Sequence, residues 1–138
     1  MDRAPRRVAA LVLALTLPAR ALAFSIPVGT PIPDDDMPVL DGGHHHLLGT
    51  ARASVFVFVR TGQDHSLDVL ERLARIEKEL ANKSVHFVAV VSDQEPVEEV
   101  RELVRASGIR MTVLVDKADA LYGALGVKLH PVVGVVDA

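Results

Sequence analysis

Short apolar runs alternate with amphipathic segments through most of this sequence, and this alternation restricts the possible folds more than any other feature. The apolar runs are rich in β-branched residues and lack polar alternation, which is typical of strands buried on both faces. We expect strands over residues 54–59, 85–91, 112–115 and 132–136. Strands that alternate with helices need crossover connections, which place helices on the faces of a mostly parallel sheet. The sequence therefore predicts an α/β sandwich.

Three helices are expected between these strands. In the first, Val69, Leu73, Ile76 and Leu80 recur at the period of an amphipathic helix. Its first turn can be capped by the side chain of Asp64 or Ser66, and it is expected to end near Asn82. The other two each end at a glycine, which is a common helix terminator. They are predicted from Pro96 to Gly108 and over residues 118–125.

The first 23 residues differ from the rest of the chain. An apolar core over residues 8–17 follows three arginines and precedes an Ala-Leu-Ala tripeptide, which has the small-x-small form of a cleavage site. A membrane anchor is the alternative, but this core is shorter than the roughly 18 residues that a membrane span needs. We predict a signal peptide over residues 1–23, cleaved after Ala23. The mature domain, residues 24–138, is then periplasmic or secreted and has no stable membrane span.

The composition excludes several classes of function. The chain of 138 residues has no cysteine, so it cannot form a disulfide, bind a metal through thiolates or use a cysteine nucleophile. Residues 24–138 hold 17 acidic and 11 basic residues, and only 4% of the whole chain is aromatic. Nucleic-acid binding needs a basic face or stacking rings, so we expect no nucleic-acid partner. We also expect no cofactor.

A small hairpin is predicted near the start of the mature domain. Residues 37–40 and 44–48 flank an Asp-Gly-Gly turn that begins at Asp41. On an extended strand, His44 and His46 share a face, and with Asp41 they could hold a divalent ion. The competing interpretation is that both histidines are exposed polar residues, because the spacing supplies no committed third ligand.

The order of elements resembles the redoxin branch of the thioredoxin fold. The resemblance rests on the segment GIRMTVLVDKADALYGALGV, on the X-Pro bond before the last strand, and on the opening VGTPIPDDDMPVLDGG, which is similar to the family's VGxPAPDF-x-LPxLDG. The TlpA-like thiol:disulfide reductases and the alkyl-hydroperoxide-reductase/thiol-specific-antioxidant (AhpC/TSA) group are the members that it resembles. The resemblance implies a thioredoxin-like three-layer sandwich with a mixed sheet and a cis-proline at Pro131. It also implies one more strand and a C-terminal helix, so a chain that stops at Ala138 is predicted to be truncated.

The active turn departs from the family pattern. In residues 59–67, Gln63 aligns with the attacking cysteine of the family and Ser66 with the resolving cysteine. Neither residue can exchange a disulfide, and a peroxidase mechanism fails because it also needs a thiolate. The resemblance implies an oxidoreductase, but the thiol mechanism of that family cannot operate in this chain. Whether the protein is an enzyme is left open.

The altered turn still lies where α/β folds place ligands, at the carboxyl end of a strand and the start of a helix. The simplest interpretation is that Asp64 and Ser66 only cap the helix and that His65 is a solvated turn residue. We hypothesise a non-redox binding or scaffold module for an envelope protein, a peptide or a small anion. The candidate site residues are Arg60, Gln63, Asp64, His65 and Ser66, with His130 and Pro131 across the cleft.

Two enzyme alternatives remain beside the binding module. One uses non-thiol chemistry at His65 and His130, and the other uses a metal held by the histidine hairpin. A hydrolase with Ser66 as nucleophile and His65 as base is disfavoured, because adjacent side chains on a helical turn point apart.

Overall fold

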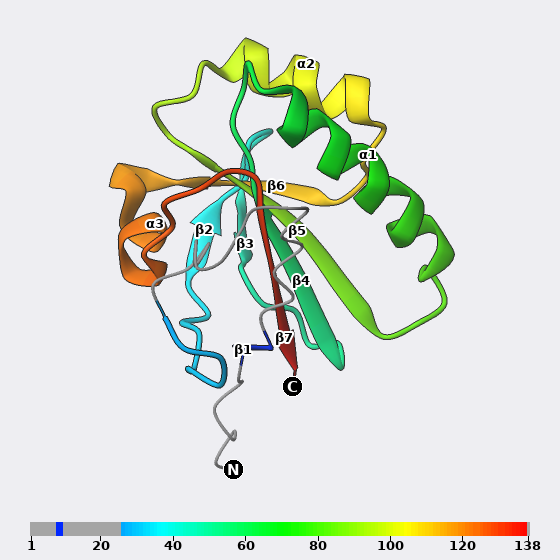
Figure 1. Ribbon diagram of the computed structural model, residues 1–138, viewed down its shortest axis with the longest axis vertical. Helices are drawn as coiled ribbons and strands as arrows, with labels where there is room; N and C mark the ends of the chain where they lie inside the picture. The colour runs from blue at the N-terminus through cyan, green and yellow to red at the C-terminus, as the bar shows by residue number, and fades with distance from the viewer. Residues whose placement is uncertain (1–7, 10–25, 138) are drawn as a thin grey trace, which may run out of the picture.

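The computed structural model describes residues 8–9 and 26–137 (Figure 1). Apart from the two residues of a short strand, the predicted signal peptide and its cleavage site lie outside the described residues, so cleavage after Ala23 stays a prediction. Within the described part of the chain, no helix is both long and apolar enough to cross a bilayer.

A mixed five-stranded sheet in the order β1-β7-β4-β5-β6 forms the centre of the molecule. Its parallel part consists of β4 (Ala53–Phe58), β5 (Val85–Ser92) and β6 (Thr112–Asp116). The strand β7 (Val132–Asp137) runs antiparallel to β4, and β1 (Val8–Ala9) pairs antiparallel with β7. The four predicted strands are therefore present, and the predicted α/β class is confirmed.

Helices cover the sheet on both faces (Figure 1). On one face, α1 (Asp64–Glu79) packs beside α2 (Val97–Ser107), and on the other lies α3 (Ala120–Leu125). The third helix was predicted to begin at residue 118, but residues 117–119 form a separate 3-10 turn, η1 (Lys117–Asp119). This turn holds two consecutive non-glycine residues with positive φ, 53° at Ala118 and 52° at Asp119, so the α-helix cannot start there.

The predicted hairpin is confirmed. It consists of β2 (Asp36–Pro38) and β3 (His44–His46), which pair antiparallel. Its turn needs glycine, because Gly42 and Gly43 have φ values of 104° and 78°. Beyond β2, the amide of Leu40 donates to the carbonyl of Val113 at 2.9 Å, which attaches the hairpin to the edge of β6.

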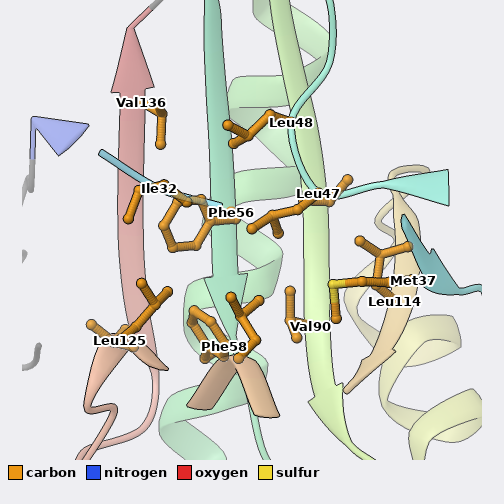
Figure 2. Close-up of a cluster of buried hydrophobic side chains, with 13 residues drawn as sticks. Ile32, Met37, Leu47, Leu48, Phe56, Phe58, Val90, Leu114, Leu125 and Val136 are labelled. Atoms are coloured by element: carbon orange, nitrogen blue, oxygen red, sulfur yellow. The ribbon is translucent and has the colours of Figure 1, made fainter. Parts of the chain in front are cut away.

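The side chains of β4 alternate between two apolar cores. Phe56 and Phe58 point toward α3 and the hairpin, where they pack with Leu47, Val90 and Leu125 (Figure 2). Val57 and Val59 belong to the second core, which lies between the sheet and the pair α1 and α2. Two cores on opposite faces of one sheet make the three-layer sandwich that the sequence predicts.

Candidate functional site

The turn between β4 and α1 is held by the side chain of Ser66. This residue is fully buried, and its Oγ accepts a hydrogen bond from the amide of Arg60 at 3.1 Å. The same hydroxyl donates to Oε1 of Gln63, also at 3.1 Å. The two positions that align with the family's cysteines are therefore hydrogen-bonded to each other.

The predicted helix caps are wrong. The N-cap residue of α1 is Gln63, and no side chain caps its amides. Asp64 is the first residue inside the helix, where its charge suits the positive end of the helix dipole. Ser66 cannot cap because its hydroxyl is used by the backbone of the preceding turn. The simplest sequence interpretation, capping alone, therefore does not explain Ser66.

The same contacts exclude a serine hydrolase at this turn. A nucleophilic hydroxyl must reach a substrate and a base. Ser66 has no exposed surface, and its hydroxyl both donates and accepts within the turn. His65 lies exposed on the first turn of α1.

A second group of polar side chains surrounds His130. The peptide bond between His130 and Pro131 is cis. The imidazole of His130 stacks on the ring of Tyr122, with centroids 5.2 Å apart and planes 29° apart. Tyr122 in turn meets Phe58 edge-on at 4.8 Å, so the core of the protein fixes the stack.

Two charged side chains lie near this stack. Nε of Arg60 is 3.7 Å from Oε1 of Glu95, and Oε2 of Glu95 accepts a hydrogen bond from the hydroxyl of Thr61 at 2.5 Å. The name "His130 cluster" is used below for Arg60, Glu95, Tyr122 and His130. Its members come from four different segments of the chain, brought together where β4 and β5 end.

The surroundings keep both rings of the stack uncharged. Burial lowers the pKa of His130, and the charge of Arg60 lowers it further, against the opposing effects of Glu95 and Asp119. Burial, followed by the carboxylate of Asp116, raises the pKa of the Tyr122 phenol above its ordinary value of 10.0. The imidazole and the phenol are thus neutral hydrogen-bonding groups at neutral pH.

Each ring of the stack also carries an unpaired polar atom. Among the described residues, Nε2 of His130 and Oη of Tyr122 are buried and have no hydrogen-bond partner. Buried polar atoms are paired in the great majority of cases, and each exception needs an explanation. A bound polar group would supply the missing hydrogen bonds only if neighbouring side chains moved aside, because both atoms are buried.

Carboxylates behind the stack hold Tyr122 in place. The buried Asp116 accepts hydrogen bonds from the amides of Leu121 and Tyr122 at 3.0 and 2.9 Å. The hydroxyl of Ser92 donates to Asp119 at 2.5 Å, which ties η1 to the end of β5. These contacts fix the start of α3 and therefore the position of the phenol.

Of the candidate residues named from the sequence, Arg60 lies close enough to His130 for its charge to lower the pKa of the imidazole. Glu95 and Tyr122 are not among those candidates. Glu95 follows the carboxyl end of β5, and side chains at the carboxyl ends of parallel strands gather at one edge of the sheet. The position of Glu95 after a parallel strand could therefore have identified it as a candidate site residue. Nothing in the local sequence distinguishes Tyr122 from an ordinary core aromatic residue of a short helix.

The hairpin histidines contact carboxylates separately. Nδ1 of His44 is 3.5 Å from Oδ2 of Asp36, and Nδ1 of His46 is 3.7 Å from Oδ1 of Asp34. Asp41, the suggested third ligand, pairs instead with an arginine of α2 at 3.6 Å. The described ranges contain no group of three histidines or carboxylates that could hold a metal ion.

Comparison with known proteins defines the fold. No protein-family profile and no curated protein matches this sequence. Among solved structures, an uncharacterized conserved protein from Geobacillus kaustophilus superimposes with a TM-score of 0.74 at 21% identity, over 88% of this chain and 69% of that one. A secreted Mycobacterium tuberculosis disulfide oxidoreductase homologous to Escherichia coli DsbE gives 0.64 at 16% identity, over 72% and 73%.

A thioredoxin-family thiol:disulfide interchange protein from Chlorobium tepidum gives a TM-score of 0.66 at 18% identity, over 80% of each chain. The structural neighbours thus include thiol:disulfide oxidoreductases with the thioredoxin fold, and the present chain has that fold. Identities this low establish the fold alone. What separates this chain from such proteins is the absence of cysteine from its sequence.

Proposed function

We propose that this protein is an exported thioredoxin-fold domain without thiol chemistry, which binds an envelope protein through an extended peptide segment at the active turn and the His130 cluster. The observation that carries the proposal is the hydrogen bond between Ser66 and Gln63, at the positions where the family has its two cysteines. A pair of thiols is replaced there by a pair of neutral polar groups. Without cysteine the chain has no thiol redox centre at this turn.

The binding surface is supported by the chemistry of its side chains. Oη of Tyr122 and Nε2 of His130 belong to uncharged rings and lack a partner among the described residues, but both atoms are buried, so a peptide reaches them only when neighbouring side chains move aside. The amide groups of a peptide offer donors and acceptors for such atoms. Arg60, whose side chain is about half exposed, adds a positive charge for an acidic side chain or another small anion.

Export is proposed from the sequence of residues 1–23. The three arginines before the apolar core, the core itself and the Ala-Leu-Ala tripeptide after it are the parts of a secretory signal. Mass spectrometry of the protein from the envelope fraction should give a mature chain that begins at Phe24. An intact N-terminus in that fraction would contradict cleavage.

Absence of redox activity is tested by reduction of insulin with dithiothreitol as electron donor. The wild-type protein is expected to give the rate of the buffer control, because disulfide exchange needs a thiolate. A rate above that of heat-inactivated protein would contradict the non-redox function.

Binding at the turn is tested by site-specific photocrosslinking in the native envelope. A photoreactive amino acid replaces exposed His65 in one variant and exposed Arg72, two turns further along α1, in the control. Position 65 is expected to give a discrete adduct that position 72 does not. The adduct should weaken when His130→Ala or Arg60→Ala is added. If both positions give the same adducts, or if the added substitutions change nothing, the turn is not the binding surface.

A further inference from the structure

A groove that shares no residue with the turn or the His130 cluster is lined by α2, by the loop after it, by the start of β6 and by the hairpin turn. Its volume is about 460 Å³, which is within the range of small-molecule sites. Several apolar side chains line it. They are Val39, Leu40, Val104, Ile109 and Met111.

Three arginines also line this groove. Arg101 and Arg105 are four residues apart on α2, so they lie on one face of the helix. Gly108 ends α2 in the left-handed conformation, with φ of 75°, and the chain then turns toward β6 through Arg110. The amide of Arg110 donates to the carboxylate of Glu77 at 3.1 Å, which ties this loop to α1. The helix and a fixed loop thus bring three arginines to the lining of one groove.

The groove is basic although the domain is acidic. Residues 26–137 hold 17 acidic and 11 basic residues, so the domain has a clear excess of negative charge. The groove is lined by three arginines and by a single acidic residue, Asp41. A ligand that complements both its charge and its apolar side chains has an anionic head group and an aliphatic body.

The existing ion pairs of these arginines do not block such a ligand. Nη1 of Arg101 is 2.8 Å from Glu98 and its Nε is 3.6 Å from Asp41, and Nη1 of Arg105 is 2.5 Å from Glu102. In all three pairs the carboxylate is largely exposed, and exposed pairs of this kind are weak. A carboxylate in the groove meets the guanidinium groups beside an apolar surface, where charge-assisted hydrogen bonds are stronger than in open water.

We propose that this groove binds a small amphipathic anion, an aliphatic chain that carries a terminal carboxylate. The carboxylate pairs with Arg105 and Arg110, whose planar guanidinium groups suit its two oxygens. The chain lies along Val104, Ile109 and Met111. This site is independent of the function proposed for the turn, so either can fail without the other.

The test is a titration of the isotope-labelled protein with octanoate, followed by amide chemical shifts in NMR spectra. Octanol, with the same chain length and no charge, is the matched ligand. Octanoate is expected to give saturable shifts for residues 39–41 and 104–113, and to bind about tenfold more tightly than octanol. High salt should reduce this difference, because screening weakens the charge contribution.

Two matched variants locate the head group. R105Q/R110Q removes two charges from the groove, and R72Q/R75Q removes the same number from the exposed surface of α1. The first variant is expected to bind octanoate about tenfold more weakly and octanol as the wild type does, whereas the second should bind both unchanged. Retained octanol binding also shows that the first variant is folded.

Three results would overturn the proposal. The first is equal binding of octanoate and octanol by the wild type. The second is unchanged octanoate binding in R105Q/R110Q. The third is a set of chemical shift changes that are absent, that do not saturate or that fall outside the groove. The last pattern would indicate adsorption at the surface and no site.

Discussion

The imidazole of His130 lies stacked on the phenol ring of Tyr122, with ring centroids 5.2 Å apart. One polar atom on each ring is buried, and neither atom has a hydrogen-bond partner in the described part of the chain. The stack is therefore held by packing against Phe58 and by the backbone of α3, not by polar contacts of the two rings. Its stability should respond to any change that puts a charge on either ring.

Acidification is expected to destabilise the protein through His130. Its pKa is lowered by burial, so below the ordinary value of 6.5 the unfolded chain takes up a proton that the folded chain resists. The stability contributed by the neutral ring is complete above about pH 6.5 and is lost as the pH falls below it. Thermal unfolding at pH 7.5 and 5.5 should show a smaller drop in Tm for His130→Gln than for the wild type. Equal drops would show that His130 is not the titrating group.

Removal of the phenol oxygen is expected to cost little stability. Tyr122→Phe deletes a buried hydroxyl that has no partner among the described residues, so at pH 8 the free energy of unfolding should stay within about 1 kcal/mol or increase. Burial raises the pKa of this phenol, so the wild type should also lose stability as the pH rises above about 10, when the unfolded chain ionises. Tyr122→Phe has no phenol to ionise, so it should not show this loss of stability. Urea unfolding at pH 8 and 10.5 measures both effects, and a variant that is clearly less stable at pH 8 would reveal a hydrogen bond of the hydroxyl.

Two cysteines placed in the turn are expected to restore disulfide chemistry. The side chains of Gln63 and Ser66 are already within hydrogen-bonding distance, and the helix N-terminus favours a thiolate. Gln63→Cys with Ser66→Cys should form an internal disulfide and reduce insulin, whereas Gln63→Cys with Ser66→Ala should do neither. The readouts are the mass after thiol alkylation and the insulin rate. Two thiols that stay free under oxidising conditions would mean that the turn no longer has the geometry of the family.

The elements of the fold could be predicted because local patterns determine them. The segments that form β4 and β5 are apolar on both faces and rich in β-branched residues, which favours strands buried in a sheet. The predicted ends of an element were wrong where a long-range contact or local backbone strain determines them. Residues 117–119 form the irregular turn η1 because Asp93 accepts the amide of Ala118 and Ser92 holds Asp119, and neither contact is visible in the local sequence.

The candidate site could be predicted only in part, for a related reason. The resemblance to the family pointed to Gln63 and Ser66. Residue preference predicted that Ser66 caps the helix, whereas its hydroxyl accepts a hydrogen bond from the backbone amide of Arg60 in the turn. Short polar side chains serve caps and turns equally well, so the sequence cannot separate the two roles. Tyr122 was missed because its role depends on the stack with His130, which only the packed structure creates.

The contact between β4 and β7 allows no side chain at Gly134. This glycine is the register partner of Phe56, and a Cβ added to it would lie 2.3 Å from Cζ of that ring. Gly134→Ala is therefore expected to destabilise the protein by about 1–3 kcal/mol, the usual cost of overpacking a core. Gly123→Ala is the control, because a Cβ there meets no atom within 4 Å and alanine favours the helix α3, which predicts a gain of about 0.5–1 kcal/mol.

A double-mutant cycle ties the effect at Gly134 to the aromatic ring of Phe56. In a Phe56→Leu background the side chain opposite is smaller, so Gly134→Ala should cost less than it does in the wild type. Urea unfolding of the four proteins gives the coupling free energy directly. An identical cost in both backgrounds would place the clash elsewhere, and a Gly134→Ala protein as stable as the wild type would show that the two strands can separate enough to admit a methyl group.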